Sequence, residues 1–168
     1  MSQTTVPPSH VEITYGVPST APEPDLAAAT RQFLTFRLAD ERFGISIDSI
    51  VEILKYRPAT PVPRADPVVH GIVSVRGQVV TVLDGRLRLG LPAAEIGGAT
   101  RIIVVHDGSE LVGLLVDEVV EVVRLADDAI AAPPATVRDA GARGIVGVCD
   151  THDEKILILL DIDRVLRI

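Results

Sequence analysis

Residues that could carry out chemistry are few in this chain and lie far apart. The four histidines show none of the spacings by which histidine and cysteine bind zinc, and the single cysteine lies inside an apolar run. Asp161 and Asp163 are close together, but no further oxygen ligands of a calcium loop accompany them. No phosphate-binding loop, dinucleotide fingerprint or nucleophile elbow occurs. The sequence therefore predicts no metal, no cofactor and no catalytic site; the residues in question are His10, His70, His106, His152 and Cys149.

Arg76 is the strongest candidate for a binding residue. It lies between two short runs of β-branched residues, 71–75 and 79–83, so the sequence places it at the tip of a β-hairpin with Gly77 behind it. Arginine is among the residue types that dominate protein interfaces. The alternative, which the residues alone favour, is an ordinary solvated arginine in a turn.

The hairpin has a second copy further along the chain. GIVSV at 71–75 is matched by GIVGV at 144–148, and VVTVLD at 79–84 by ILILLD at 156–161. Upstream, the segment 43–54 falls on 112–123, with Gly44, Asp48 and Glu52 matched by Gly113, Asp117 and Glu121. Three ordered matches indicate an internal duplication, with halves at about 32–97 and 98–168.

Comparison of the two halves separates the fold from the candidate site. In this alignment Arg76 falls on Cys149, so the repeated architecture does not require a guanidinium at the hairpin tip. Positions filled alike in both halves, such as Asp48 and Asp117, are interpreted as requirements of the shared fold. Glu52 has Glu121 as its copy, so a structural role for Glu52 carries at least as much weight as a binding role.

About ten short strands and very little helix predict a mainly β protein built as a pair of small barrels. Asp84 and Asp161 each precede a short segment with a helical pattern and are predicted to cap helical turns. The segments 57–67 and 127–143 are predicted loops. Residues 1–31 contain five of the twelve prolines and no sustained apolar period, so we expect a disordered N-terminal tail.

Composition limits the partners and the compartment. The net charge of −7 disfavours a nucleic-acid surface, because phosphate binding needs concentrated lysine and arginine. One cysteine fits a reducing compartment. No apolar run approaches the length of a membrane span, and the N-terminus lacks the pattern of a signal peptide. We therefore expect a cytoplasmic protein that does not insert into the membrane.

The ordered segments of the chain resemble one known family. QFLTFRL, IVEIL, HGIVSVRGQVVTVLDGRLRLGLP, VGLLVDEVVEV and ILILLDIDRVL, within residues 32–168, are similar to the CheW family of chemotaxis adaptor proteins. The resemblance implies two tandem, similar, five-stranded SH3-like barrels packed on each other, with few helical turns. It also implies a non-catalytic scaffold that couples the cytoplasmic tips of methyl-accepting chemoreceptors to a CheA-type histidine kinase.

The resemblance also implies where the receptor binds. Its receptor-binding positions correspond in this chain to Arg76, Gly77, Glu52, Ile50 and Gly71. Two departures from the family pattern lie nearby: Ser74 stands where an asparagine is usual, and Gly85 follows Asp84 where a leucine is usual. No kinase-contacting residue is predicted.

Three other functions are compatible in part with the sequence and serve as alternatives to the adaptor. An enzyme would need a nucleophile with a base, or paired carboxylates in a pocket, and no convincing spacing of either is present. A small-ligand β-barrel protein would use the apolar seam between the barrels as its pocket. A stand-alone homologue of the regulatory domain of the kinase would share the fold without the kinase core.

Overall fold

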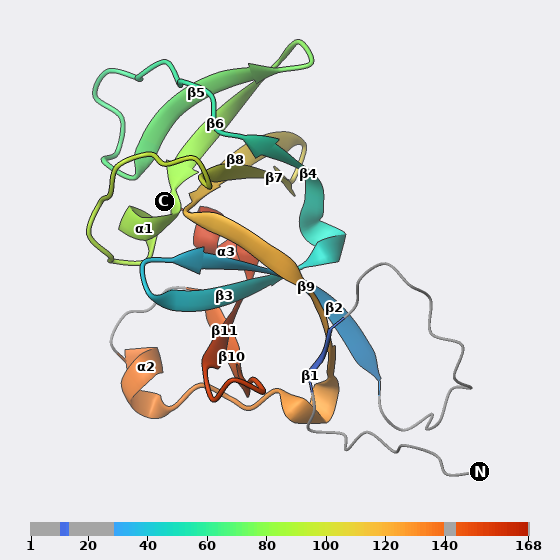
Figure 1. Ribbon diagram of the computed structural model, residues 1–168. Coiled ribbons are helices and arrows are strands. Elements are labelled where there is room, and N and C mark those ends of the chain that lie inside the picture. Colours follow the sequence, from blue (N-terminus) through green and yellow to red (C-terminus); the bar gives the residue numbers. More distant parts are fainter. Residues whose placement is uncertain (1–10, 14–28, 140–143, 168) are drawn as a thin grey trace, which may run out of the picture.

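The computed structural model describes residues 11–13, 29–139 and 144–167 and shows a mainly β protein with two sheets and few helices (Figure 1). Sheet A has the order β1-β9-β2-β3-β11-β10. Its strands are β1 (Val11–Ile13), β2 (Thr30–Leu38), β3 (Glu41–Ser46), β9 (Glu118–Ala126), β10 (Ile145–Asp150) and β11 (Ile156–Leu160).

Sheet B has the order β4-β7-β8-β6-β5. Its strands are β4 (Ile50–Lys55), β5 (Val69–Val75), β6 (Gln78–Asp84), β7 (Arg101–Asp107) and β8 (Glu110–Val116). The short helices are α1 (Gly85–Arg88), α2 (Ala135–Asp139) and α3 (Ile162–Leu166), with 3₁₀ turns η1 (Ile47–Ser49) and η2 (Asp127–Ala129). The sequence predicted α1 and α3, whereas α2 and η2 lie in a segment predicted to be a loop.

Each sheet is assembled from both halves of the sequence. The hairpin β2-β3 of the first half joins β9, β10 and β11 of the second, while the hairpin β7-β8 of the second half joins β4, β5 and β6 of the first. With β1 set aside, the two sheets have the same strand order with the halves exchanged. The repeat in the sequence is therefore also a repeat in topology, but the sheets do not divide at residue 97.

Both sheets curl until their edges meet. In sheet B, Thr60 and Ile72 exchange backbone hydrogen bonds of 2.8 and 2.9 Å between the chain after β4 and the far edge strand β5. In sheet A, Ala131 and Val148 make the equivalent exchange, also at 2.8 and 2.9 Å, between the chain after β9 and β10. We call the two closed units barrel A and barrel B after their sheets.

Three apolar cores hold the molecule together. Barrel A has its own core around Phe33 and Leu157, and barrel B around Val80 and Ile102. A central core joins the barrels and contains Phe36, Leu38, Ile45, Leu83, Ile103, Leu114, Leu160 and Val165. Burying a side chain of this size contributes about 1.5 to 3 kcal/mol. The seam that a small-ligand carrier would need is thus packed with side chains.

The strand pairings revise one step of the sequence alignment. Gly71 pairs with Val82, and Gly147 pairs with Leu159, the residue that matches Val82 in the second half. Gly71 therefore corresponds to Gly147, not to Gly144. Both positions require glycine, because an added Cβ would lie 2.7 Å from the Thr60 oxygen at one and 2.6 Å from Ile130 Cγ2 at the other.

This revision changes the counterpart of Arg76. Once Ile72 is equivalent to Val148, Val73 is equivalent to Cys149 and Arg76 to His152. The buried environments agree, since Val73 is 5% exposed and Cys149 2%. The match of Arg76 with Cys149 was wrong because two glycines three residues apart offered two registers, and only the tertiary pairing distinguishes them.

Both predicted helix caps are present. The carboxylate of Asp84 accepts a hydrogen bond of 3.1 Å from the Leu87 backbone at the start of α1. Asp161 accepts one of 3.0 Å from the Asp163 backbone at the start of α3. These bonds satisfy backbone donors that have no partner within the helix. The role of Asp161 is therefore capping.

The N-terminal segment differs in part from the predicted tail. Val11–Ile13 forms β1, which pairs antiparallel with residues 123–125 of β9, and β2 begins at Thr30. The prediction of a disordered 1–31 thus differs from the structure at residues 11–13 and 30–31. Residues 1–10 and 14–28 lie outside the described part of the chain.

Candidate functional site

The candidate site begins with a two-residue turn. Strands β5 and β6 are joined by Arg76 and Gly77, whose φ angles are 51° and 81°. A turn with both central residues in the left-handed region matches the twist of a β-hairpin. Glycine adopts this conformation freely, but for a residue with a side chain it costs about 1 to 2 kcal/mol. The chain therefore keeps an arginine at a position where glycine or asparagine would fit the backbone better.

Arg76 and Glu52, proposed from the resemblance as parts of one site, lie together. The Arg76 guanidinium is 3.3 Å from Glu52 Oε1, with side chains 80% and 20% exposed respectively. β4 and β5 are opposite edges of sheet B, so this contact exists only because the sheet closes. An ion pair this exposed contributes at most about 1 kcal/mol, and most of the guanidinium remains available to a partner.

Ile50 and Gly71 hold structural positions beside this pair. Ile50 opens β4, is half-buried and packs against the central core. Gly71 is buried beneath Ala59 and Thr60, where no side chain fits. These two residues fix the strands that carry Glu52 and Arg76.

Further contacts across the same barrel closure were missed in the sequence. Tyr56 Oη lies 3.0 Å from His70 Nε2, and Arg57 donates a hydrogen bond of 2.9 Å to the Ser74 carbonyl. His70 is thus a hydrogen-bonded partner at the barrel seam. No sequence signal pairs these residues, because they meet only when the sheet curls.

Exposed apolar side chains also lie on the strands of the site. Val79 on β6 is 69% exposed, and Val51 and Ile53 on β4 are 41% and 42% exposed. They alternate with residues that face the barrel, such as Val80 at 0%. Large exposed apolar groups beside a charged tip are typical of protein interfaces. The alternation along 78–84 could have identified Val79 from the sequence.

The equivalent end of barrel A is chemically different. There the hairpin turn is longer, and a hollow of about 300 Å³ is lined by Thr35, Arg42, Glu121, Thr151, His152 and Asp153 with three apolar residues. Arg42 and Asp153 are 3.6 Å apart. This end of barrel A therefore carries acidic and basic side chains close together, whereas the same end of barrel B carries the exposed Arg76.

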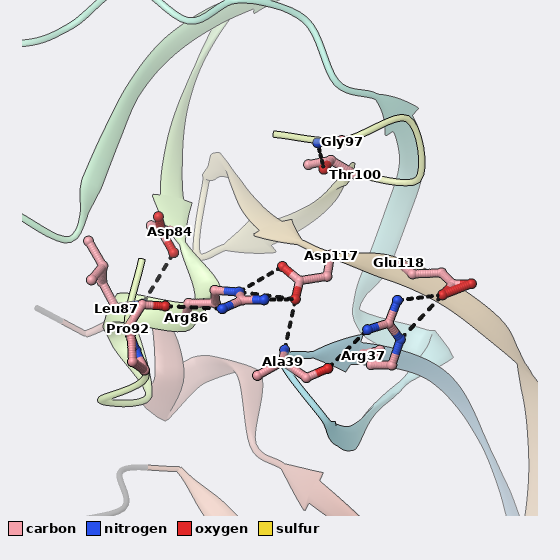
Figure 2. A network of polar contacts seen from close by, with 10 residues as sticks. All are labelled: Arg37, Ala39, Asp84, Arg86, Leu87, Pro92, Gly97, Thr100, Asp117 and Glu118. Carbon is pink, nitrogen blue, oxygen red and sulfur yellow. Dashed lines mark hydrogen bonds and ion pairs between the residues drawn. The ribbon is translucent and has the colours of Figure 1, made fainter. Parts of the chain in front are cut away.

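The junction between the barrels carries a polar network (Figure 2). Asp117 is the single residue between β8 of barrel B and β9 of barrel A. Arg86 of α1 donates to its carboxylate through Nη2 at 2.6 Å and through Nε at 3.0 Å, and the Ala39 backbone donates to Oδ2 at 2.7 Å. Burial by itself would raise the pKa of Asp117, but the hydrogen bonds from Arg86 and Ala39 outweigh it and lower the pKa. The same contact raises the pKa of Arg86.

This network extends along the junction on the barrel A side. Arg37 Nη2 donates a hydrogen bond of 2.8 Å to Glu118 Oε1, and Arg37 Nη1 donates one of 3.0 Å to the Ala39 carbonyl (Figure 2). The duplication in the sequence predicts that Asp117 and Asp48 are equivalent requirements of the fold. They differ in the structure, because no hydrogen bond or ion pair to the Asp48 carboxylate occurs within the described residues.

Metal-ligand and thiol chemistry find little support in the structure. Across residues 11–13, 29–139 and 144–167, no group of three or more histidine, cysteine, aspartate or glutamate side chains could hold a metal ion. Cys149 is buried in the core of barrel A, and burial raises the pKa of its thiol. A buried thiol of raised pKa is a poor nucleophile.

Comparison with known proteins agrees with this architecture. The CheW-like domain family matches residues 32–168. A chemotaxis protein CheW of Rhizobium meliloti is 34% identical over 138 residues, which cover 80% of this chain and 86% of that protein. Protein FrzA of Myxococcus xanthus is 32% identical over 151 residues, 88% of this chain and 94% of that protein.

A solved structure shows the same fold. The crystal structure of the scaffolding protein TtCheW from Thermoanaerobacter tengcongensis matches with a TM-score of 0.73 and 26% identity, over 83% of this chain and 94% of that one.

The chain belongs to the CheW-like family. The resemblance inferred from the sequence is confirmed, as is the mainly β fold of two packed five-stranded units. As a CheW-like protein, the chain has a scaffold or adaptor role in chemotaxis signalling. Among the described residues, no helix is long and apolar enough to cross a membrane.

Proposed function

We propose that this CheW-like protein is a non-catalytic, cytoplasmic adaptor that couples the cytoplasmic tips of chemoreceptors to a CheA-type histidine kinase, with Arg76 at the centre of the receptor contact. The observation that carries the proposal is the conformation of Arg76. An arginine is kept in a left-handed turn, 80% exposed, at a position where glycine would relieve the backbone. Backbone strain occurs often at binding sites, and at Arg76 it coincides with the tip of a hairpin and with an ion pair to Glu52.

Glu52 is the second residue of the proposed receptor contact. Its carboxylate, 20% exposed, limits the range of the Arg76 guanidinium and reduces the entropy that Arg76 loses on binding. Gly77 allows the turn. Ile50 holds β4 by packing on the central core, and Gly71 allows β5 to lie close to Thr60. The exposed Val79 of β6, and Val51 and Ile53 of β4, add apolar surface on strands of the same sheet.

The proposed mechanism is assembly. A receptor helix and a kinase domain bind to the same adaptor, so a change in one contact alters the other through the geometry of the complex. No residue of the site needs to break or form a covalent bond in this mechanism.

The test removes the Arg76 side chain while relieving the backbone. Arg76→Gly should leave the free energy of unfolding unchanged or raise it by up to about 1 kcal/mol, yet weaken binding to a receptor cytoplasmic fragment at least tenfold in a calorimetric titration. Arg64→Gly is the matched control, because Arg64 is also exposed and has a φ of 61° in the same half of the chain. Unchanged affinity in the Arg76 variant, or an equal loss in the Arg64 variant, would exclude Arg76 from the receptor contact.

A further inference from the structure

The two barrels are connected by two direct chain crossovers that occupy equivalent places in the repeat. One runs from β3 through η1 to β4, and the other runs from β8 through Asp117 to β9. The paired strands place Gly44 and Gly113, and likewise Glu52 and Glu121, at the same positions of their sheets, so Asp48 and Asp117 are equivalent residues. Each crossover thus carries an aspartate in the same place.

Only one of these aspartates joins the barrels. The Asp117 carboxylate accepts hydrogen bonds from Arg86, which lies in α1 directly after β6 of barrel B, and from the Ala39 backbone in the β2-β3 turn of barrel A. The backbone N–H of Asp117 donates a hydrogen bond of 3.1 Å to the Arg37 carbonyl on β2. The carboxylate of Asp48 makes no such bond within the described residues.

The geometry of the Arg86 contact is directional. Two guanidinium nitrogens meet the carboxylate at 2.6 to 3.0 Å, and both side chains are only about one fifth exposed. A planar fork on a carboxylate fixes angle as well as distance. The third nitrogen of the Arg86 guanidinium donates a hydrogen bond of 3.2 Å to the Pro92 carbonyl. This bond helps to hold the guanidinium in place.

The apolar contacts of the central core favour association of the barrels more strongly than one rotation of one barrel against the other, because hydrophobic association is non-directional. The buried Arg88 of α1 adds hydrogen bonds to the backbone carbonyls of Val165 and Arg167 at α3, so the Arg86–Asp117 contact is a second directional link between the barrels. Directional bonds at the edge of such an interface select a single orientation.

We propose that Arg86 and Asp117 are positioning residues that help to fix the orientation of barrel B relative to barrel A, so that the receptor contact on barrel B and the adjoining part of barrel A present one arrangement to the receptor. The link to binding rests on the proposed function, but the effect on barrel orientation does not. The other crossover, which contains Asp48, has no equivalent restraint among the described residues.

Orientation can be measured directly with two spin labels. Exposed sites are available at Glu110 in barrel B and Lys155 in barrel A, with Cys149→Val removing the native thiol, as valine fills the equivalent position 73. Asp117→Asn, which can still accept from Ala39, and Arg86→Gln should each broaden or shift the distance distribution. The double variant should be no worse than either single one, because both remove the same contact. Asp48→Asn should match the parent distribution.

Receptor affinity is the second measurement. We expect Asp117→Asn, Arg86→Gln and the double variant each to weaken binding of a receptor cytoplasmic fragment about three- to tenfold, and Asp48→Asn to leave it unchanged. Arg86→Lys keeps the positive charge but cannot make the two-nitrogen contact with the Asp117 carboxylate. It replaces the other variants if they fold poorly, and it should give an intermediate loss of receptor affinity.

The outcomes separate the two proposals. Unchanged distance distributions in the Arg86 and Asp117 variants would overturn the positioning role. A changed distribution with unchanged affinity would overturn its link to binding. If the parent protein itself does not bind the receptor fragment, the proposed function fails while the distance measurements still decide the role of Arg86 and Asp117.

Discussion

The two barrels share a strand order but differ at their hairpin turns and at the crossovers between them. Barrel B ends in a two-residue turn that presents Arg76, while barrel A has a longer turn around His152 and a hollow with mixed charges. β9 of barrel A is covered by β1, whereas its equivalent β4 in barrel B is the outer strand of the described sheet. The shared strand order follows from the common fold. The hairpin turns and the crossover aspartates differ between the barrels, and these differences indicate where the candidate functions lie.

The largest effect is expected in the shared part. Val82 is 0% exposed in barrel B and its equivalent Leu159 is 1% exposed in barrel A. Changing either to Asp buries a carboxylate without a partner, at a cost of several kcal/mol against a total stability of about 5 to 15 kcal/mol. Both variants should fail to give soluble, cooperatively melting protein. A soluble Leu159→Asp variant beside an insoluble Val82→Asp one would show that barrel A is not essential to folding as barrel B is.

The next effect should be confined to one barrel. Arg76→Glu should weaken receptor binding at least tenfold, because it replaces the guanidinium by a charge that Glu52 and the partner repel. Its free energy of unfolding should fall by no more than about 1 kcal/mol, because the exposed pair with Glu52 is weak. His152→Glu, the equivalent change in barrel A, should leave receptor affinity unchanged in the same titration. Equal losses in both variants would mean that the receptor does not distinguish the barrels.

A smaller effect concerns pH. The pKa of Asp117 is held below its ordinary value of 3.8, so its carboxylate contributes stability above that value and loses it as the pH falls through the lowered pKa. At pH 7, Asp117→Asn should lower the melting temperature by roughly 2 to 4 °C, corresponding to about 1 kcal/mol. This difference should shrink at pH 3 or below. A difference of the same size at pH 7 and at pH 3 would contradict the stabilising role of the ionised Asp117 carboxylate.

The smallest effect is expected at the covered edge of barrel A. Deletion of residues 1–28 removes β1, a three-residue strand at the sheet edge, and leaves β2 intact. We propose that residues 1–28 contribute little to folding, so the melting temperature should fall by no more than a few degrees. A larger fall in thermal melting would show that barrel A depends on β1, which barrel B does without.

Much of the architecture was predictable from local pattern. The β-branched runs, the turn at Arg76 and Gly77, the capping aspartates and the duplication follow from residue types and short spacings, because strand pleat, turn conformation and helix caps act over a few residues. The family resemblance then predicted a scaffold with two similar barrels.

The tertiary structure decided which residues meet. It exchanged the hairpins between the halves, made Arg76 the counterpart of His152, brought Glu52 to Arg76 across a closed sheet, and gave Asp117 a role that Asp48 lacks. All of these depend on contacts between residues far apart in the chain. A sequence with two similar halves fits both a tandem and an exchanged arrangement, since each strand looks the same in either. Only the packing of the whole chain around its central core selects between them.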